Sequence, residues 1–590
     1  MNGNLRLCDN WAVKLPRPGT FWPCIEKEMS ADMTGSIRSL ADVAQDLGLS
    51  AKDLLPFGHD KAKLSRAVLD EQPAKMGRLI LVSAINPTPA GEGKTTTAIG
   101  LQMGLARLQK SACLALREPS LGPVFGVKGG GTGGGRASLF PAADINLHFT
   151  GDLHAITSAN NLLAALADNA VYHRETFAEK GGLDPRQITL GRALDVNDRF
   201  LRRCVIGLGG KAHGTPREAR FDITAASEVM AALALATNYE DLAERIGNIV
   251  VGASENGQPI TARELRAQDA MVALLRDALL PNLVQTVEGG PALVHLGPFA
   301  NIAHGCSSAL ATKFALGRAD YVITEAGFGF DLGGEKFLDL KCRQLGVWPR
   351  LVVLVATLRA LKFHGGVKLA SVGEKNAAAL DAGLLHLEKH LSSVAQFGLP
   401  AVVAINVFPD DDREELRRVE QAVAKHGASV AQTTAFSDGG AGAVALAEQV
   451  VALAEKGDAA PPAPRYLYEP EDDFLEKLRK IACTVYGAKH VTIAAAAEKD
   501  LQRFSSWGFG KLPICVAKTQ LSLSDDPNLV GVPTDHTLTV REIRLSAGAG
   551  FLVALSGEIV SMPGLPKKPA AWNIHLTPTG DVRGLMQNEH

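Results

Sequence analysis

The sequence predicts an α/β fold, with a doubly wound, mostly parallel sheet followed by two smaller C-terminal domains. Residues 78–85 form a β-rich apolar run, and a Pro/Gly loop separates them from a helix-favouring stretch, Thr95 to Leu108. Strand, glycine loop and helix are the opening unit of a doubly wound sheet. Similar apolar runs alternate with helical stretches, and we expect buried strands at 112–116, 203–208, 248–252, 292–296, 320–324 and 351–356.

The segment before the first strand predicts helices between residues 36 and 70. Leu40, Val43, Ala44 and Leu47 recur at helical spacing, and a glycine follows where a helix would end. Residues 1–30 have neither the apolar core nor the cleavage site of a signal peptide. We expect them to be a loosely ordered extension, or a start placed upstream of the true one.

The chain is expected to divide into four parts, which are residues 1–30, 31–382, 383–460 and 461–590. In the third part a buried strand at 401–407 precedes a charged helix that begins at Asp412. Pro461-Pro-Ala-Pro464 marks a linker, and the alternating run from Thr537 to Arg544 predicts β structure in the fourth part.

The composition argues against nucleic acid and membranes as partners. The formal net charge of the 590 residues is −2, with 21% charged and 46% hydrophobic residues. Such a balance gives no field that would attract nucleic acid or an anionic membrane, and no apolar run is long enough to span a bilayer. No Cys/His spacing resembles a zinc site. We therefore expect a cytoplasmic protein that holds any anion in a local site.

The most informative local motif is Thr88-Pro-Ala-Gly-Glu-Gly-Lys-Thr95, which matches the second half of a phosphate loop. Glycines let backbone N–H groups approach phosphate oxygens, and the helix that follows points its positive end at them. Lys94 adds a positive charge, and the Thr95 hydroxyl can ligate the Mg²⁺ of Mg-ATP. The predicted nucleotide-binding residues are Thr88, Pro89, Ala90, Gly91, Glu92, Gly93, Lys94, Thr95 and Thr96.

A P-loop NTPase-like domain is thus expected over residues 31–382. The departure from the full motif is Thr88, which stands where the first glycine is usual. The alternative is a glycine-rich turn with a chance lysine. A phosphate loop predicts a nucleotide but not a reaction, so the reaction has to be inferred from the rest of the sequence.

Longer motifs carry a resemblance to a known family. They include the run from Arg117 to Arg136, which contains Val-Lys-Gly-Gly-Gly-Thr-Gly-Gly-Gly-Arg, and Asp144-Ile-Asn-Leu-His-Phe-Thr-Gly-Asp152. Others are Gly297-Pro-Phe-Ala-Asn-Ile-Ala-His-Gly305 and Met562-Pro-Gly-Leu-Pro-Lys-Lys-Pro569. With these motifs the chain resembles formate–tetrahydrofolate ligase from about residue 30 onward.

The resemblance implies an ATP-dependent ligation in two steps. ATP phosphorylates formate to formyl phosphate, and N10 of tetrahydrofolate then attacks the formyl carbon and expels phosphate. Because formyl phosphate is a small labile anion, it needs charge neutralisation and exclusion of water. Lys94 and Arg117 are expected to supply the charge. Glu118 and Asp152 are candidates to accept a proton or order the folate, or else are buried structural carboxylates.

Other expected site residues follow from the same resemblance. Phe408 and Phe436 would clamp the flat pterin ring of the folate, although either could be an ordinary core residue. Arg136, Phe299 and His304 are expected to border the formyl phosphate pocket. The glycine run 129–135 would form a lid or a wall of that pocket, or a mobile loop.

In the folate clamp, Phe436 stands where the family normally has tryptophan. The chain departs from the family pattern at four further places. Arg136 stands where tyrosine is usual, and the loop 438–443 lacks a lysine and a glutamate. Leu521 and Leu523 replace aromatic residues, and Phe330 and Gly334 replace alanines. Because the phosphate loop is intact, this pattern favours altered binding of the second substrate over lost ATP chemistry.

Three functions therefore stay open. The first is the ligase, which would give 10-formyltetrahydrofolate, ADP and phosphate. The second is a diverged paralogue with another carboxylate or pterin, or one that works mainly in the ATP-forming direction. The third is a non-catalytic nucleotide-binding scaffold. For the ligase the resemblance also implies a homotetramer that a monovalent cation, K⁺ or NH₄⁺, stimulates.

Overall fold

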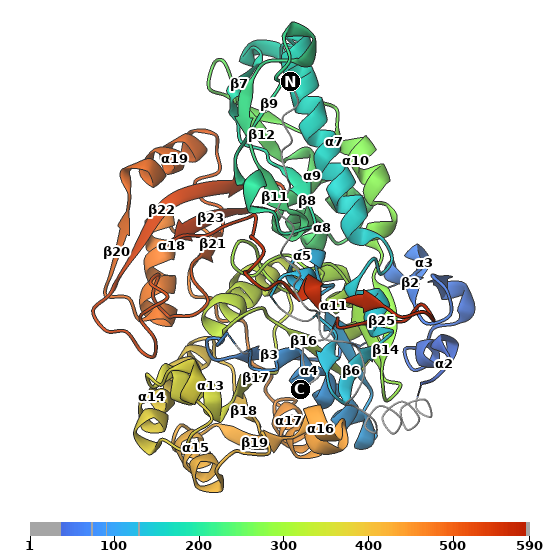
Figure 1. The fold of residues 1–590 in the computed structure, drawn as a ribbon, viewed down its shortest axis with the longest axis vertical. Helices are drawn as coiled ribbons and strands as arrows, with labels where there is room; N and C mark the ends of the chain where they lie inside the picture. The colour runs from blue at the N-terminus through green and yellow to red at the C-terminus, as the bar shows by residue number, and fades with distance from the viewer. Residues whose placement is uncertain (1–36, 72–74, 90, 128–129, 586–590) are drawn as a thin grey trace, which may run out of the picture.

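A computed structural model describes residues 37–71, 75–89, 91–127 and 130–585. The predicted extension 1–30 and Ala90 of the phosphate loop lie outside the described residues. Figure 1 shows three bodies, which are a central sheet with helices on both faces, a lobe drawn in cyan and green above it, and an orange C-terminal domain at its side.

The central sheet is α/β and mostly parallel, as predicted. Its strand order within the described residues is β1 (Leu54–Pro56), β2 (Ala62–Leu64), β14 (Asn282–Thr286), β15 (Pro291–Val294), β4 (Ala112–Leu116), β16 (Tyr321–Glu325), β3 (Arg78–Ala84), β17 (Leu351–Ala356), β18 (Ala401–Asn406) and β19 (Ser429–Thr433). Every pair from β15 to β19 is parallel, whereas β1, β2 and β14 pair antiparallel. β6 (Ala137–Phe140) joins β14, and β5 (Gly133–Gly134) joins β6.

Helices cover both faces of the sheet because its strands are apolar on both sides. Along β3, Leu79 and Leu81 belong to one core, while Ile80 and Val82 belong to the other. The second core is closed by α4 (Lys94–Arg107) and α17 (Val444–Lys456). The first is closed by α11 (Ala309–Leu316), α13 (Leu358–His364), α14 (Ala377–Gln396) and α15 (Arg413–Lys425).

A second lobe interrupts the main sheet. Its core joins α7 (Asp152–His173), α8 (Glu228–Leu235), α9 (Tyr239–Gly247) and α10 (Gln268–Leu275). The expected strand at 248–252 is β12 (Val250–Ser254), which pairs antiparallel with β7 (Leu183–Ile188) and β13 (Pro259–Thr261) in a separate small sheet. Its place in the parallel sheet was therefore wrongly predicted.

The prediction of a buried strand at 203–208 is also wrong. Residues 204–206 form β9, an antiparallel hairpin strand that pairs with β10 (Arg217–Ala219) and is partly exposed. The reason is the glycine cluster that follows. Gly207, Gly209 and Gly210 adopt φ values of +75°, +109° and +92°, which turn the chain away instead of leading it into a crossover helix.

The N-terminal segment is only partly helical. α2 (Leu40–Gln45) is capped by the Ser39 side chain, which accepts a hydrogen bond from the backbone N–H of Asp42, and α3 spans Arg66–Leu69. Between them β1 and β2 form the antiparallel edge of the sheet, which contradicts the helices expected throughout 36–70. Lys63 on β2 is fully buried because it pairs with Asp152.

The last part of the chain contributes to two sheets. β18 and β19 extend the central sheet next to β17. The division of the chain at residue 383 stays a prediction about functional units. The C-terminal domain contains α18 (Phe474–Ile481), α19 (Ala495–Ser506) and a sheet in the order β20 (His490–Ile493), β22 (Thr537–Ser546), β23 (Phe551–Ser556), β21 (Ile514–Ala517).

The remaining elements are short. They are α5 (Leu121–Phe125), α6 (Ala142–Asn146), α12 (Arg343–Leu345), α16 (Ala435–Asp438), β8 (Arg192–Leu194), β11 (Phe221–Ile223), β24 (His575–Leu576), β25 (Val582–Arg583), and the π-helical segments η7 (Phe330–Gly334), η8 (Phe337–Cys342) and η11 (Ala482–Tyr486). Over the residues that the structure covers, no helix is both long and apolar enough to cross a bilayer.

Candidate functional site

The functional side chains gather where the parallel strands end. The phosphate loop follows β3, Arg117 follows β4, Glu325 ends β16, and Asn406 ends β18. Phe408 and Phe436 come shortly after β18 and β19. Because these strands are parallel, their carboxyl ends lie along one edge of the sheet, which is where open α/β sheets bind ligands.

The phosphate loop has the backbone that its glycines predict. Gly91 and Gly93 adopt left-handed φ values of +83° and +73°, and Gly93 directly precedes α4. A Cβ atom on Gly93 would lie 2.8 Å from Asn406 Nδ2, so a larger residue is also excluded sterically. Lys94, Thr95 and Thr96 start the helix half-buried, and the helix N-terminus leaves backbone N–H groups for an anion.

Polar contacts hold this loop in place. Asn406 donates from Nδ2 to the Glu92 carbonyl at 2.7 Å and accepts at Oδ1 from the Thr97 hydroxyl at 3.0 Å. The buried Glu92 carboxylate accepts from the Thr88 backbone N–H at 2.6 Å. This contact uses the backbone of Thr88, which a glycine could supply as well, and Pro89 after it is exposed.

Glu325 links the phosphate loop to Arg117. The Thr95 hydroxyl donates to Glu325 Oε2 at 2.8 Å, and Arg117 Nη2 lies 3.8 Å from Glu325 Oε1. Hydroxyl and carboxylate oxygens are the donors that Mg²⁺ prefers, so Thr95 and Glu325 together fit the metal of Mg-ATP. The sequence did not indicate this role, because Glu325 ends a buried strand 230 residues after Thr95.

Glu118 lies in a second, more deeply buried cluster. Asp152 forms an ion pair with Lys63 at 2.8 Å and accepts from Asn282 Nδ2 at 2.9 Å. Burial, then the charge of Asp152, raises the pKa of Glu118 well above its ordinary value, although Lys63 opposes this. The raised pKa favours the protonated form of Glu118. Neither carboxylate is a free base.

The loop 297–305 carries Phe299 and His304. Both ring nitrogens of His304 are fully buried without a hydrogen-bond partner among the described residues. Burial and the nearby cations, Lys341 and Arg245 first among them, hold the pKa of His304 well below its ordinary value, so the ring is neutral. Phe299 donates its backbone N–H to the Ala225 carbonyl at 2.9 Å and packs between the lobes.

Phe408 and Phe436 both present ring surface at the strand ends. Phe408 is half-buried, and the Arg359 guanidinium carbon lies 4.1 Å from its ring centroid. Phe436 is 47% exposed. Its carbonyl accepts from the Arg136 backbone N–H at 2.8 Å, so Arg136 is placed beside the predicted folate clamp. The Arg136 side chain is exposed. The preceding Gly135 packs against Phe436, because a Cβ atom at position 135 would lie only 2.1 Å from the Phe436 carbonyl oxygen.

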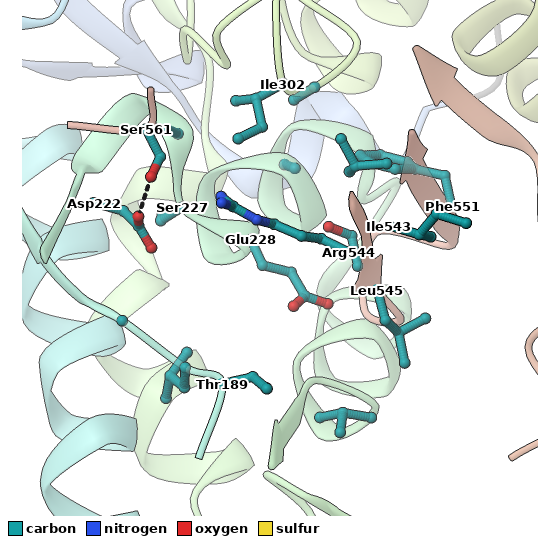
Figure 2. A pocket seen from close by; sticks show the side chains of 18 of the residues that line it. Thr189, Asp222, Ser227, Glu228, Ile302, Ile543, Arg544, Leu545, Phe551 and Ser561 are labelled. Atoms are coloured by element: carbon teal, nitrogen blue, oxygen red, sulfur yellow. Dashed lines mark hydrogen bonds between the residues drawn. The ribbon is translucent and has the colours of Figure 1, made fainter. Parts of the chain in front are cut away.

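A cavity of about 180 Å³ lies elsewhere, between the second lobe and the C-terminal domain (Figure 2). Glu228, Arg544, Asp222 and Ile302 are among its lining residues. Glu228 accepts from the Gly548 backbone N–H at 2.7 Å, and burial raises its pKa to about 8. None of the predicted site residues lines this cavity, although Ile302 and Ala303 belong to the loop that carries Phe299 and His304.

Metal ligands made only of protein side chains are not assembled in the described residues, since no group of three or more His, Cys, Asp or Glu could hold a metal ion.

Comparison with known proteins gives a consistent result. The family model described as formate–tetrahydrofolate ligase matches residues 26–586. A relative named formate–tetrahydrofolate ligase from Myxococcus xanthus (strain DK1622) is 59% identical over 554 residues, which cover 94% of this chain and 100% of the relative. Relatives with the same name from Rhizobium etli and Rhizobium rhizogenes (strain K84) are 51% and 52% identical, over 96% and 93% of this chain and 100% and 97% of their own lengths.

Proposed function

The chain belongs to the formate–tetrahydrofolate ligase family, and we propose that both steps of its reaction take place at the carboxyl edge of the central sheet. The enzyme is a ligase that joins formate to tetrahydrofolate at the expense of ATP and gives 10-formyltetrahydrofolate, ADP and phosphate. The observation that carries our placement of the site is the contact chain from Thr95 through Glu325 to Arg117.

For the first step, the phosphate loop binds ATP. Backbone N–H groups at Gly91 and Gly93 and the N-terminus of α4 face the phosphates, and Lys94 neutralises the phosphoryl group in transfer. Thr95 and Glu325 would hold Mg²⁺, whose charge offsets that of the phosphates. A formate oxygen attacks the γ-phosphorus, the bond to the ADP oxygen breaks, and formyl phosphate results.

Arg117 is proposed to bind formate and then formyl phosphate. Its 3.8 Å separation from Glu325 is too long for a strong paired hydrogen bond, and its Nε has no partner among the described residues. The planar guanidinium therefore keeps donors for a carboxylate or an acyl phosphate. His304, neutral and unpaired, supports a second donor or acceptor near this pocket, with Phe299 and Arg136 as candidate walls.

In the second step the folate N10 attacks the formyl carbon, the carbon–oxygen bond to phosphate breaks, and the leaving phosphate takes up the proton that N10 loses. We propose that Phe408 and Phe436 hold the pterin ring for this attack. Because the raised pKa of Glu118 favours its protonated form and Asp152 is paired with Lys63, we assign these two carboxyl groups to positioning the Arg117 turn instead of accepting the N10 proton.

An assay of ADP release tests the function. We expect release only when formate and tetrahydrofolate are supplied together, since formyl phosphate is protected until N10 attacks. Rapid release with formate alone, or none with both, would contradict the two-step assignment at this site. Running the same assay with other short carboxylates measures how far Arg117 restricts the substrate.

The remaining family properties are also proposals. Phe200, Val205 and Leu208 are strongly exposed on the second lobe, which supports a buried contact in a homotetramer. Light scattering of the purified protein tests that state. We further propose a cytoplasmic enzyme that K⁺ or NH₄⁺ stimulates, with residues 31–382 binding the nucleotide, 383–460 serving the folate, and 461–590 forming the C-terminal unit.

A further inference from the structure

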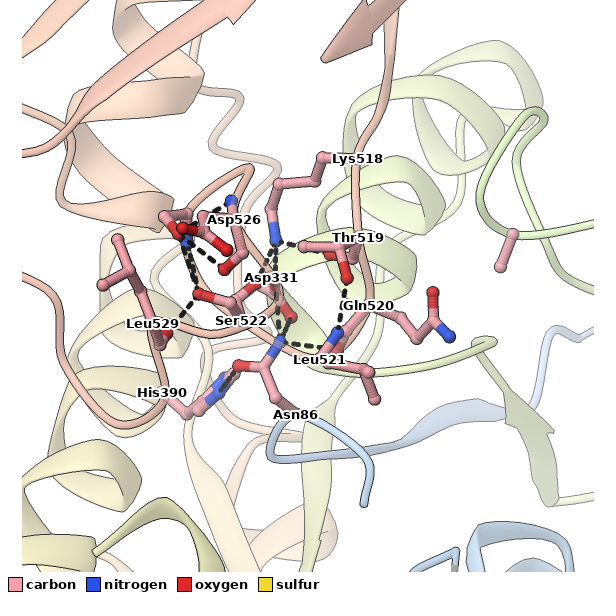
Figure 3. A network of polar contacts seen from close by, with 12 residues as sticks. Asn86, Asp331, His390, Lys518, Thr519, Gln520, Leu521, Ser522, Asp526 and Leu529 are labelled. Carbon is pink, nitrogen blue, oxygen red and sulfur yellow. Dashed lines mark hydrogen bonds and ion pairs between the residues drawn. The ribbon is translucent and has the colours of Figure 1, made fainter. Parts of the chain in front are cut away.

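A buried ion pair connects the C-terminal domain to the start of the phosphate loop. Lys518 follows β21, and its Nζ lies 2.8 Å from Asp331 Oδ2 in η7, with both side chains fully buried (Figure 3). Asn86, the second residue after β3, donates from Nδ2 to both Asp331 oxygens at 3.2 Å. We propose that Lys518 and Asp331 are positioning residues that set the phosphate loop for ATP, an inference that rests on the proposed function.

Asn86 is where the inference starts, because its side chain is bound from several directions. Besides Asp331, its Nδ2 donates to the Gln520 carbonyl at 3.0 Å. Its Oδ1 accepts from His390 Nε2 at 3.0 Å, and its backbone carbonyl accepts from His364 Nε2 at 2.8 Å. Asn86, two positions before Thr88, therefore contacts four parts of the structure, which are α13, α14, η7 and the C-terminal domain.

The Asp331 carboxylate and the Gln520 carbonyl together orient the Asn86 amide. A carboxylate accepts only, so Asn86 must turn its NH₂ group toward Asp331 and its oxygen toward His390. Burial alone would raise the pKa of Asp331, but the charge of Lys518 and the hydrogen bonds hold it below its ordinary value. Burial lowers the pKa of His364 and, to about 4, that of His390, so both rings are neutral and donate from Nε2.

Lys518 also fixes the segment that covers Asn86. Besides the ion pair, its ammonium donates to the carbonyls of Thr519 and Ser522, so the chain wraps around the charge. This wrapping brings the Gln520 carbonyl against Asn86 (Figure 3). The C-terminal domain is thereby attached to the first turn of the phosphate loop through a fully buried charge, and removing that charge leaves Asp331 unpaired in the core.

Two double variants distinguish an effect on the position of the phosphate loop from a general loss of stability. Lys518→Met/Asp331→Asn removes both charges with side chains of similar size, which is less disruptive than removing one partner. An asparagine at position 331 can turn either its oxygen or its NH₂ group toward Asn86, and without the Lys518 charge the segment that carries the Gln520 carbonyl is no longer held in place. The Asn86 amide is then less firmly oriented, so only a fraction of the molecules has a phosphate loop ready to bind ATP. We expect the ATP KM to rise at least about fivefold while kcat changes less than about twofold.

The control is another buried ion pair, Lys362 with Glu415 at 3.0 Å, which does not contact Asn86. Lys362→Met/Glu415→Gln should lower Tm by a similar amount but leave the ATP KM within about twofold of wild type. An unchanged ATP KM in Lys518→Met/Asp331→Asn, whatever its Tm, would overturn the inference.

A third variant keeps the test decisive if the first double variant does not fold. Asn86→Ser retains the Lys518–Asp331 pair and removes only the amide, so we expect the same rise in ATP KM with a smaller loss of Tm. An unchanged KM there also overturns the inference. Lys94→Ala tests the ATP site itself. If turnover falls in Lys94→Ala while the ATP KM stays unchanged in the Asn86 and Lys518/Asp331 variants, the further inference is wrong but the proposed function still holds.

Discussion

The Thr95 hydroxyl donates a 2.8 Å hydrogen bond to Glu325, which connects the first turn of α4 to the end of the neighbouring strand β16. Arg117 approaches the other oxygen of the same carboxylate from the next strand, β4. One carboxylate thus stands between the residue that would help to hold Mg²⁺ and the residue that would bind formate. With the roles that we propose, this arrangement would bring the γ-phosphate and the formate oxygen side by side.

Glu325→Gln tests that relationship. The amide keeps the shape but loses the charge, so we expect the Mg²⁺ concentration for half-maximal rate to rise about tenfold, with partial rescue at high Mg²⁺. Titrating Mg²⁺ at saturating ATP is the measurement. Glu455→Gln is the control, because Glu455 accepts from Tyr321 Oη at the opposite end of β16. An unaltered Mg²⁺ dependence in Glu325→Gln would remove Glu325 from the metal site.

Lys94→Ala should lower turnover at least about a hundredfold, because one charged donor in such a site contributes about 3–4 kcal/mol. The ammonium neutralises the phosphoryl group in transfer and then the acyl phosphate, so kcat should fall more than ATP affinity does. Steady-state kinetics at saturating substrates measure this. A variant that keeps more than about half of the wild-type rate would contradict the phosphate-loop assignment.

Arg117→Lys keeps the positive charge but loses the planar fork. We expect the formate KM to rise and kcat to fall, while the ATP KM changes little. The comparison of formate and ATP kinetics in one preparation is the measurement. If ATP affinity collapses and formate kinetics stay normal, Arg117 serves the nucleotide instead.

The phosphate loop and its strand and helix could be predicted from the sequence because they are contiguous. The segment from Thr88 to Thr95 contains the glycines and the lysine that the loop needs. The residues on either side show the hydrophobic patterns of a strand and of a helix. Glu325, Asn406 and Lys518 could not be found in this way. Their partners are 230, 314 and 187 residues away, and only the completed sheet brings them together.

Two errors in the predicted fold have local causes. Residues 203–208 have the apolar composition of a strand, but the glycines that follow turn the chain back into a hairpin. Helices were expected throughout 36–70 because apolar residues recur at helical spacing from Leu40 to Leu47, but that spacing belongs to α2 alone, and Lys63 lies in the buried strand β2. Its partner Asp152 compensates the buried charge, and that pairing depends on a residue 89 positions later.

Glu228→Gln should change the pH dependence of stability. The ordinary pKa of this carboxyl group is 4.5 and burial raises it to about 8, so its ionisation opposes folding progressively between those values and fully above about pH 8. The shift corresponds to at most about 5 kcal/mol, and partial exposure and relaxation reduce this to roughly 1–2 kcal/mol. The glutamine can still accept from Gly548, so Tm of the variant should exceed wild type at pH 8.5 and match it at pH 5.

Thermal melts across that range measure the difference, and Glu542→Gln, in the same cavity wall, is the control. Glu542 is paired with Arg544 on the surface, so its variant should keep the wild-type pH slope. Equal slopes for Glu228→Gln and wild type would mean that the Glu228 carboxyl group ionises in the folded protein without penalty.

The folate clamp is the last prediction, and it concerns the place where this chain departs from the family pattern. Phe408 and Phe436 follow adjacent parallel strands, and neither side chain can take part in proton or phosphoryl transfer. The Arg359 guanidinium covers one face of the Phe408 ring, so a flat ligand would have to stack on the opposite face. Phe436 is 47% exposed, more than a core residue would be, and so is available for stacking.

Phe408→Ala and Phe436→Ala should each weaken tetrahydrofolate binding. Stacking contributes about 0.5–1.5 kcal/mol beyond the area buried, so the total loss should be roughly 2–3 kcal/mol. ATP affinity should not change, because Asn406, the residue at the end of β18 that holds the phosphate loop, is retained in both variants. Phe436→Trp should preserve or tighten folate binding, since its larger ring offers more contact area.

Calorimetric Kd values for tetrahydrofolate test this, with Phe57→Ala as the control. Phe57 lies just after β1 and is 37% exposed, so its truncation removes a ring of comparable exposure at the far edge of the sheet. Because Phe436 is already exposed, its truncation should lower Tm little, and a lost affinity cannot be attributed to unfolding. Unchanged folate Kd in both clamp variants, together with lowered Tm, would mean that the two rings only pack the strand ends and that the pterin binds elsewhere along the edge.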